Sequence, residues 1–96
     1  MDFREIIEII KEAIRLEKDL EIYYPQTENS PEGWREVRVE NITNDIPPQG
    51  EVLVPEKDHL SPGHIVNAYN LSSEEDKDLK SFIIGKIKHA RFVKHN

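Results

Sequence analysis

The last third of the chain carries the pattern that most restricts the fold. Apolar and β-branched residues alternate or cluster in 64–71 (HIVNAYNL) and again in 80–93 (KSFIIGKIKHARFV), with a short charged stretch between the two runs. Such runs, bounded by turn-forming residues, are typical of a β-hairpin that leads into a further strand. Gly85 interrupts the second run and predicts a bend or bulge there. The pattern predicts a β-rich fold at this end of the chain.

The charges are distributed unevenly along the sequence. Residues 80–96 contain five Lys or Arg and no acid, whereas residues 1–79 contain eight basic and nineteen acidic residues. The net charge of the whole chain is −6, although a dedicated nucleic-acid-binding domain usually has a basic isoelectric point. The segregation predicts a binding module with one basic edge, and it points to no reaction.

The first two-thirds of the chain supply a helix and further strands. Apolar residues recur at three- and four-residue spacing in 2–18, which predicts an amphipathic helix that covers a sheet. Acids dominate its polar face, which argues against a role on a membrane surface. We expect strands at about 20–25, 34–42, 51–54, 64–71, 79–84 and 87–93.

Size and composition set the fold class. Ninety-six residues suffice for a single domain, 1–96, with one modest core. The absence of cysteine excludes disulfides and thiolate ligands, so a reducing cytoplasm is the expected location. No apolar run approaches the roughly 20 residues of a membrane span. The predicted class is α+β, mainly β: an N-terminal helix packed on a small, strongly curved antiparallel sheet, or on a partly open SH3/Sm-like barrel of about five strands.

Three segments match the motifs of a known family of small domains. Ala68 and Tyr69 match the small residue and the tyrosine that follow the family's Trp-Tyr-Leu triplet, although residues 64–66 are His-Ile-Val instead. Residues 80–87 (KSFIIGKI) match the closing motif Arg-x-Phe-x-Leu-x-Arg-Ile, with lysine at both arginine positions, and residues 38–41 fit the second strand. The chain resembles a divergent WYL domain over nearly its whole length.

This resemblance implies a non-enzymatic ligand-binding or regulatory module. In the family, basic and aromatic positions are thought to line a groove for nucleic acid or another anionic effector. In this sequence the groove residues would be Lys80, Lys86 and Tyr69, with Arg38 and Lys88 as supporting charges. Lysine cannot form the paired hydrogen bonds that arginine makes to phosphate, so lysine at both arginine positions of the closing motif would weaken phosphate binding.

Two interpretations of the basic residues stay open. They could form a strip that contacts a single-stranded nucleic acid or a nucleotide, or they could balance the acidic loop 72–78 and the glutamates of the helix. The rival function is a protein–protein adaptor that uses residues 43–63 and Trp34, with no nucleic acid and no small ligand. Pairing of edge strands into a homo-oligomer is a further expectation.

No motif in the sequence indicates an enzyme, a cofactor or a metal. The histidines at 59, 64, 89 and 95 lack the tight spacing of zinc motifs. There is no nucleophile elbow, no Gly-rich phosphate loop and no carboxylate pair in an apolar setting. We therefore expect no catalytic residue, no cofactor and no metal ligand.

Overall fold

The computed structural model describes residues 1–72 and 78–94. Its elements are α1 (Phe3–Leu16), β1 (Leu20–Tyr24), β2 (Gly33–Thr43), β3 (Val52–Leu53), β4 (Ile65–Asn70), β5 (Leu79–Ile83), the short 3-10 helix η1 (Ile84–Lys86) and β6 (His89–Phe92). The ends of the helix and of the strands lie within two residues of the ranges predicted from the sequence.

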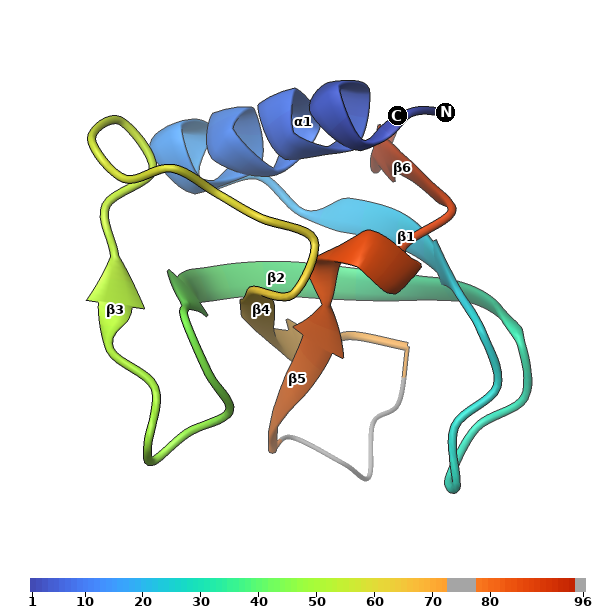
Figure 1. Ribbon diagram of the computed structural model, residues 1–96. Helices are drawn as coiled ribbons and strands as arrows, with labels where there is room; N and C mark the ends of the chain where they lie inside the picture. Colours follow the sequence, from blue (N-terminus) through green and yellow to red (C-terminus); the bar gives the residue numbers. More distant parts are fainter. Residues whose placement is uncertain (73–77, 95–96) are drawn as a thin grey trace.

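All strands pair antiparallel in one sheet with the order β5-β4-β2-β1-β6, and β3 adds to the end of β2. The long strand β2 is the centre: β1 pairs with its first half, and β4 pairs with its second half. A register shift between Val39 and Asn41 marks a bulge in β2. Figure 1 shows α1 lying along one face of this sheet.

Helix α1 has well-formed ends. The Asp2 carboxylate accepts a hydrogen bond of 2.8 Å from the Glu5 backbone N–H, as an N-cap does. At the other end Glu17 adopts a left-handed conformation with φ 52°, which stops the helix before β1. The buried face presents Ile6, Ile7, Ile10 and Ala13 to the sheet. This 14-residue helix is too short and too polar to cross a membrane, and the described residues hold no other candidate span.

The core fills the space between α1 and the sheet. Strand alternation directs Leu20, Ile22 and Val37 toward the helix, and each is at most 1% exposed. Phe82, Ile84 and Ile87, from β5, η1 and the turn before β6, are also buried. The apolar run 80–93, which the sequence predicts to form strands, thus supplies three residues of the core.

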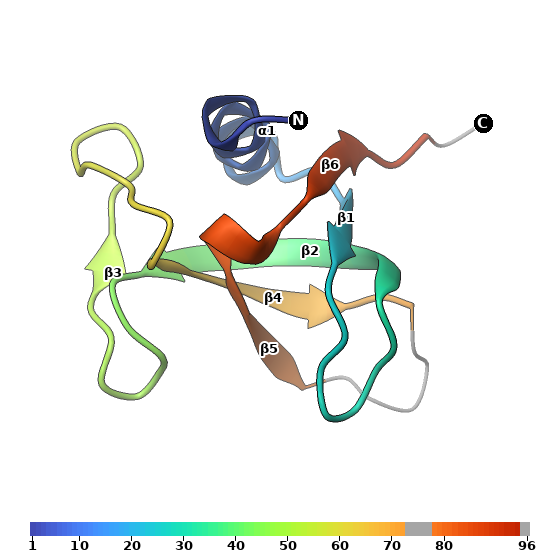
Figure 2. The ribbon, with the colours of Figure 1, turned by 45° about the vertical axis from the view of Figure 1, so that its right-hand side comes forward.

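The α+β class is confirmed, but the predicted barrel and strong curvature are wrong. The sheet is neither closed nor strongly curled (Figure 2). Within the described residues β5 pairs only with β4, and β6 pairs only with β1, so the two ends of the strand order do not meet. The short β3 joins β2 instead of bridging these ends. Closure would require a ladder between the two edge strands.

The middle segment, 43–63, begins with the last residue of β2, contains the two-residue strand β3, and otherwise forms turns and irregular structure. Leu60 reaches the core with 7% of its surface exposed. Three apolar side chains remain outside: Ile46, Val52 and Val54 are 54%, 62% and 45% exposed. Most of the turn predicted for 72–78 lies outside the described residues, as does His95.

Candidate anion-binding site

A cavity of about 300 Å³ opens on the helix-covered side of the sheet, between the β1–β2 loop and β5. Arg35, Asn70, Lys80 and Phe82 alternate in phase with the core residues of their strands and reach this cavity. Ser81 lies at the edge of β5, and the other lining residues come from the tip of the loop. The lining residues are Thr27, Asn29, Ser30, Arg35, Asn70, Lys80, Ser81 and Phe82. Of these eight described lining residues, Arg35 and Lys80 are basic and none is Asp or Glu. The chain as a whole, by contrast, has a net negative charge.

Arg35 is the most buried cation at this cavity, with 7% of its surface exposed. Its guanidinium carbon lies 5.2 Å from the centre of the Tyr24 ring and 6.0 Å from that of Phe82. Its Nη2 donates to the carbonyl oxygens of Pro25, at 3.2 Å, and Pro31, at 3.0 Å. The aromatic rings and the two carbonyls hold the guanidinium in place.

No carboxylate of the described residues lies within ion-pair distance of Arg35. Aromatic faces and neutral carbonyls only partly replace the water that a buried cation loses. A buried arginine without a counter-ion therefore leaves a positive potential in the cavity, which an anion from solution would neutralise.

Backbone and amide groups add donors at the cavity. The Asn70 Oδ1 accepts a hydrogen bond from the Ser72 N–H, at 2.9 Å, so the Asn70 amide nitrogen is the end left to donate. The Ile83 N–H bonds to the Tyr24 hydroxyl, away from β4. Residues two apart in a strand direct their N–H groups to the same side, so the Ser81 N–H also points out from the free edge of β5.

Lys80 and Tyr69, which the sequence placed in one groove, lie on opposite faces of the sheet. Lys80 pairs with Ala68 across β4 and β5 and lines the cavity. Tyr69 follows Ala68 directly, so alternation turns it to the outer face, where it is 38% exposed. Lys80 stays a candidate ligand residue, whereas Tyr69 does not lie beside it.

Arg38 also lies on the outer face, opposite Tyr69. Its Nε and Nη2 donate to the two carboxylate oxygens of Asp19 at 2.9 and 3.3 Å. The hydrogen bond and charge of Asp19 raise the pKa of Arg38. Asp19 therefore occupies the guanidinium fork that the predicted groove would have used.

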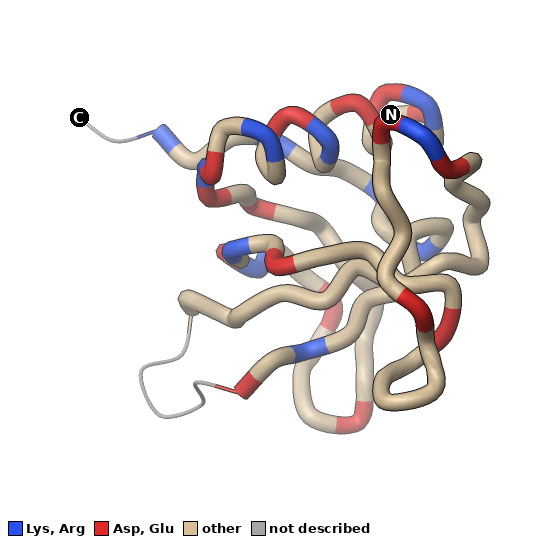
Figure 3. The backbone as a smooth tube through the Cα atoms, turned by 90° about the vertical axis from the view of Figure 1, so that its left-hand side faces the viewer, with Lys and Arg blue, Asp and Glu red and all other residues tan. Residues whose placement is uncertain are grey.

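Lys88 has an acidic partner as well. Its Nζ donates to Glu32 at 2.8 Å, which raises the pKa of Lys88 and lowers that of Glu32. Arg91 contacts Glu21 on β1 at 3.2 Å. These two acids come from β1 and from the β1–β2 loop. Figure 3 shows basic and acidic positions interspersed along the backbone.

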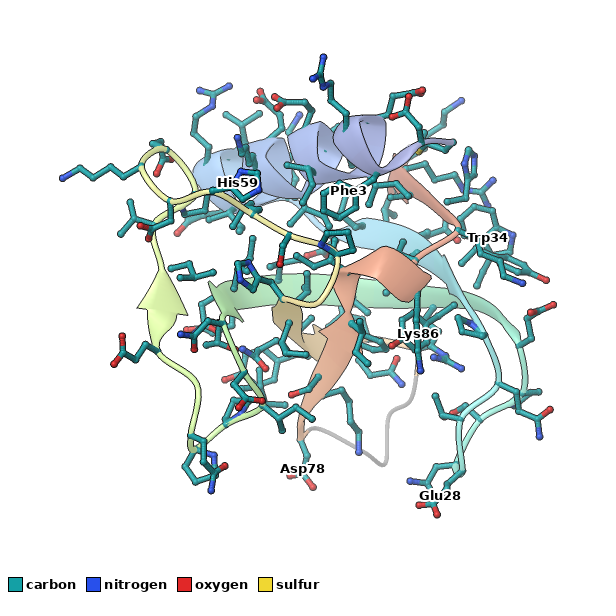
Figure 4. All side chains as sticks on the ribbon, viewed as in Figure 1. Phe3, Glu28, Trp34, His59, Asp78 and Lys86 are labelled. Carbon is teal, nitrogen blue, oxygen red and sulfur yellow. The ribbon has the colours of Figure 1, made fainter. Side chains whose placement is uncertain are left out.

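Lys86 lies in η1, is exposed, and extends away from α1 (Figure 4). It is not among the residues that line the cavity. Of the five residues predicted to bind a ligand, only Lys80 reaches this site.

Sequence reasoning missed Arg35, although a signal for it exists. Arg35 precedes Val37 and Val39 by two and four residues, so strand alternation places all three on one face. An arginine in phase with core valines predicts a buried cation. The charged neighbours of Arg35 in β2 obscured that signal.

The exposed aromatic residue Trp34 belongs to a separate cluster on the outer face. The Arg91 guanidinium lies 3.9 Å from the centre of the Trp34 ring, and Tyr23 and His89 meet that ring edge-on. Tyr24, by contrast, is buried in the core. The Trp34 cluster and Tyr24 therefore lie on opposite faces of the sheet.

No group of three or more His, Asp or Glu side chains in the described part of the chain is arranged to hold a metal ion. Comparison of the chain with protein-family models, with curated proteins and with solved structures finds no match. The resemblance to the WYL domain stays a prediction.

Proposed function

We propose that this protein is a non-enzymatic ligand-binding or regulatory module whose ligand is a small anion held in the Arg35 cavity. One observation carries the proposal: Arg35 is 7% exposed, has no carboxylate partner among the described residues, and lies at a cavity whose described lining residues include no acid. Concave sites with a few convergent polar groups are the usual places where proteins bind small ligands.

The size of the site favours a small anion over a long nucleic acid. A volume of about 300 Å³ is at the lower end of the range for ligand pockets. A nucleic-acid strand would need a row of cations along the surface. Asp19, Glu32 and Glu21 already pair with Arg38, Lys88 and Arg91. These ion pairs neutralise Arg38, Lys88 and Arg91, and the cavity at Arg35 is a cationic site apart from them.

Two observations support kinship with WYL domains. The chain runs from a helix through two strands, a long connection and a hairpin to a short last strand, which is the order expected for that family. Lys80, at the first basic position of the closing motif, lines the cavity. On this proposal the chain is a divergent relative of that family with an open sheet, and the ligand is an effector rather than a substrate.

The test is a titration of the protein with inorganic phosphate, acetate and adenosine monophosphate, followed by two-dimensional NMR at two salt concentrations. We expect shifts of the side-chain Nε–H signal of Arg35 and of the Ser81 amide. R35M should abolish them. R38M is the matched control, because Arg38 lies on the same strand but on the opposite face. Equal binding by R35M, or no binding of any anion at low salt, would refute the proposal.

The adaptor function remains the second candidate, and one observation favours it. Ile46, Val52 and Val54 expose apolar side chains along the 43–63 segment. Exposed apolar groups near a short edge strand are typical of surfaces that dock another chain. Light scattering of the wild type and of V52D at increasing concentration tests for self-association. A concentration-dependent mass that V52D lowers would support the adaptor function.

A further inference from the structure

The donors that Arg35 retains differ from those of an ordinary carboxylate-binding arginine. A guanidinium offers two parallel pairs of N–H groups, one from Nε and Nη2 and the other from Nη1 and Nη2. In this protein Nη2 donates to both Pro25 and Pro31, so its two hydrogens are in use. Because both parallel pairs include Nη2, neither pair is free to bind a ligand. A planar carboxylate is bound best by a complete pair.

The groups left to bind a ligand are single donors carried by separate elements. Nη1 and Nε of Arg35 make no hydrogen bond within the described residues, and no buried nitrogen there lacks a partner, so both keep contact with solvent. The Ser81 N–H comes from the edge of β5, and the Asn70 amide comes from the end of β4. The hydroxyl groups of Thr27 and Ser30 come from the β1–β2 loop.

We infer that the cavity binds a tetrahedral oxyanion, the phosphoryl group of inorganic phosphate or of a phosphate monoester, in preference to a carboxylate. Its oxygens point in several directions and can each accept from a different donor, whereas the two oxygens of a carboxylate lie in one plane. The second negative charge of a phosphoryl group near neutral pH also suits the buried Arg35, which has no carboxylate partner among the described residues. This inference rests on the proposed function.

Calorimetric titration of the whole chain at low ionic strength tests the inference, with inorganic phosphate, adenosine monophosphate, acetate and benzoate as probes. We expect phosphate or the monoester to bind at least about tenfold more tightly than either carboxylate, as charge-assisted hydrogen bonds of ordinary strength imply. Tighter binding of adenosine monophosphate identifies an ester as the source of the phosphoryl group. Tighter binding of inorganic phosphate identifies the free ion.

N70D provides a variant that keeps the local fold. Its carboxylate can still accept from the Ser72 N–H, but an oxygen with negative charge replaces the donor that faces the ligand. We expect phosphate affinity to fall by about tenfold or more. N44D is the matched control, because the Asn44 Oδ1 accepts from the Glu51 N–H at 2.8 Å in the β2–β3 loop, away from the cavity lining.

The outcomes separate the inference from the proposed function. Carboxylates that bind as tightly as phosphate, with both lost in R35M, would overturn the preference and keep the anion site. Phosphate binding that N70D leaves unchanged would overturn the geometry inferred for the donors. Failure of every anion to bind would overturn both.

Discussion

The backbone N–H of Ile83 donates a hydrogen bond of 2.9 Å to the hydroxyl oxygen of Tyr24. Tyr24 lies on β1 and Ile83 on β5, which are separated in the sheet by β2 and β4. The Tyr24 ring therefore reaches across the inner face, packs edge-on against Phe82 at 5.0 Å, and bonds to the free edge of β5. This contact fixes the strand edge that forms one wall of the cavity.

Y24F should destabilise the protein through this single bond. The phenyl ring keeps the packing against Phe82, but the Ile83 N–H loses its acceptor in a partly buried position. We expect the free energy of unfolding to fall by about 1–3 kcal/mol. Chemical denaturation measures the loss, and faster amide exchange at Ile83 would locate it.

Y23F is the control for this substitution. The Tyr23 hydroxyl donates to Glu32 at 3.2 Å in an exposed position, and we expect its removal to change stability by no more than about 0.5 kcal/mol. Equal effects of Y23F and Y24F would show that the Tyr24 bond does not hold the edge of β5.

Gly85 is required by close approach rather than by an unusual backbone conformation. A Cβ placed on Gly85 would lie 2.7 Å from the Pro62 Cβ and 2.8 Å from the Pro62 carbonyl oxygen, which itself accepts from the Gly85 N–H. We expect G85A to cost about 1–3 kcal/mol, as overpacking does. G63A is the matched control, because a Cβ on Gly63 meets no atom within 4 Å among the described residues. Thermal melting of both variants would measure the difference.

Local patterns predicted the elements and the core well. The spacing of apolar residues in 2–18 identified the helix whose buried face carries Ile6, Ile10 and Ala13, and the alternation in 79–84 identified the strand that brings Phe82 to the core. Both are periodicities that a single element determines. The bend expected at Gly85 corresponds to η1, which carries the chain from β5 to β6.

Relationships between elements were harder to predict. Whether Lys80 and Tyr69 share a face depends on the register of the β4–β5 hairpin. The turn between the strands sets this register, and the composition of each strand does not reveal it. The partners of Arg38 and Lys88, Asp19 and Glu32, lie 19 and 56 residues away in sequence. Closure of the sheet depends on whether the edge strands meet, which local alternation cannot reveal.

The Glu32–Lys88 pair gives a pH-dependent prediction. The hydrogen bond and charge of Lys88, followed by the Tyr23 hydroxyl, lower the pKa of Glu32. Because the folded pKa lies below the unfolded one, the pair contributes stability above the ordinary glutamate pKa. That contribution is lost as the pH falls through the folded value. NMR titration should show the midpoint of Glu32 rising toward its ordinary value in K88Q.

K86Q is the control for this titration. Lys86 lies in η1 and makes no contact with Glu32 in the described structure, so the Glu32 midpoint should stay at its wild-type value. A Glu32 midpoint that K88Q does not move would mean that the ion pair is not formed in solution.

R35M separates a ligand-binding arginine from a structural one. A methionine has nearly the length of the arginine stem and fits between Tyr24 and Phe82 without a buried charge. Without added anion we expect R35M to be as stable as the wild type, or more stable by up to about 2 kcal/mol, because the desolvated cation is removed. Phosphate at a hundred times its dissociation constant should stabilise the wild type by about 2.7 kcal/mol and leave R35M unchanged. Thermal melting with and without phosphate measures both effects.

A loss of several kcal/mol in R35M without phosphate would mean that the bonds from Arg35 to Pro25 and Pro31 hold the β1–β2 loop. The cation would then be structural.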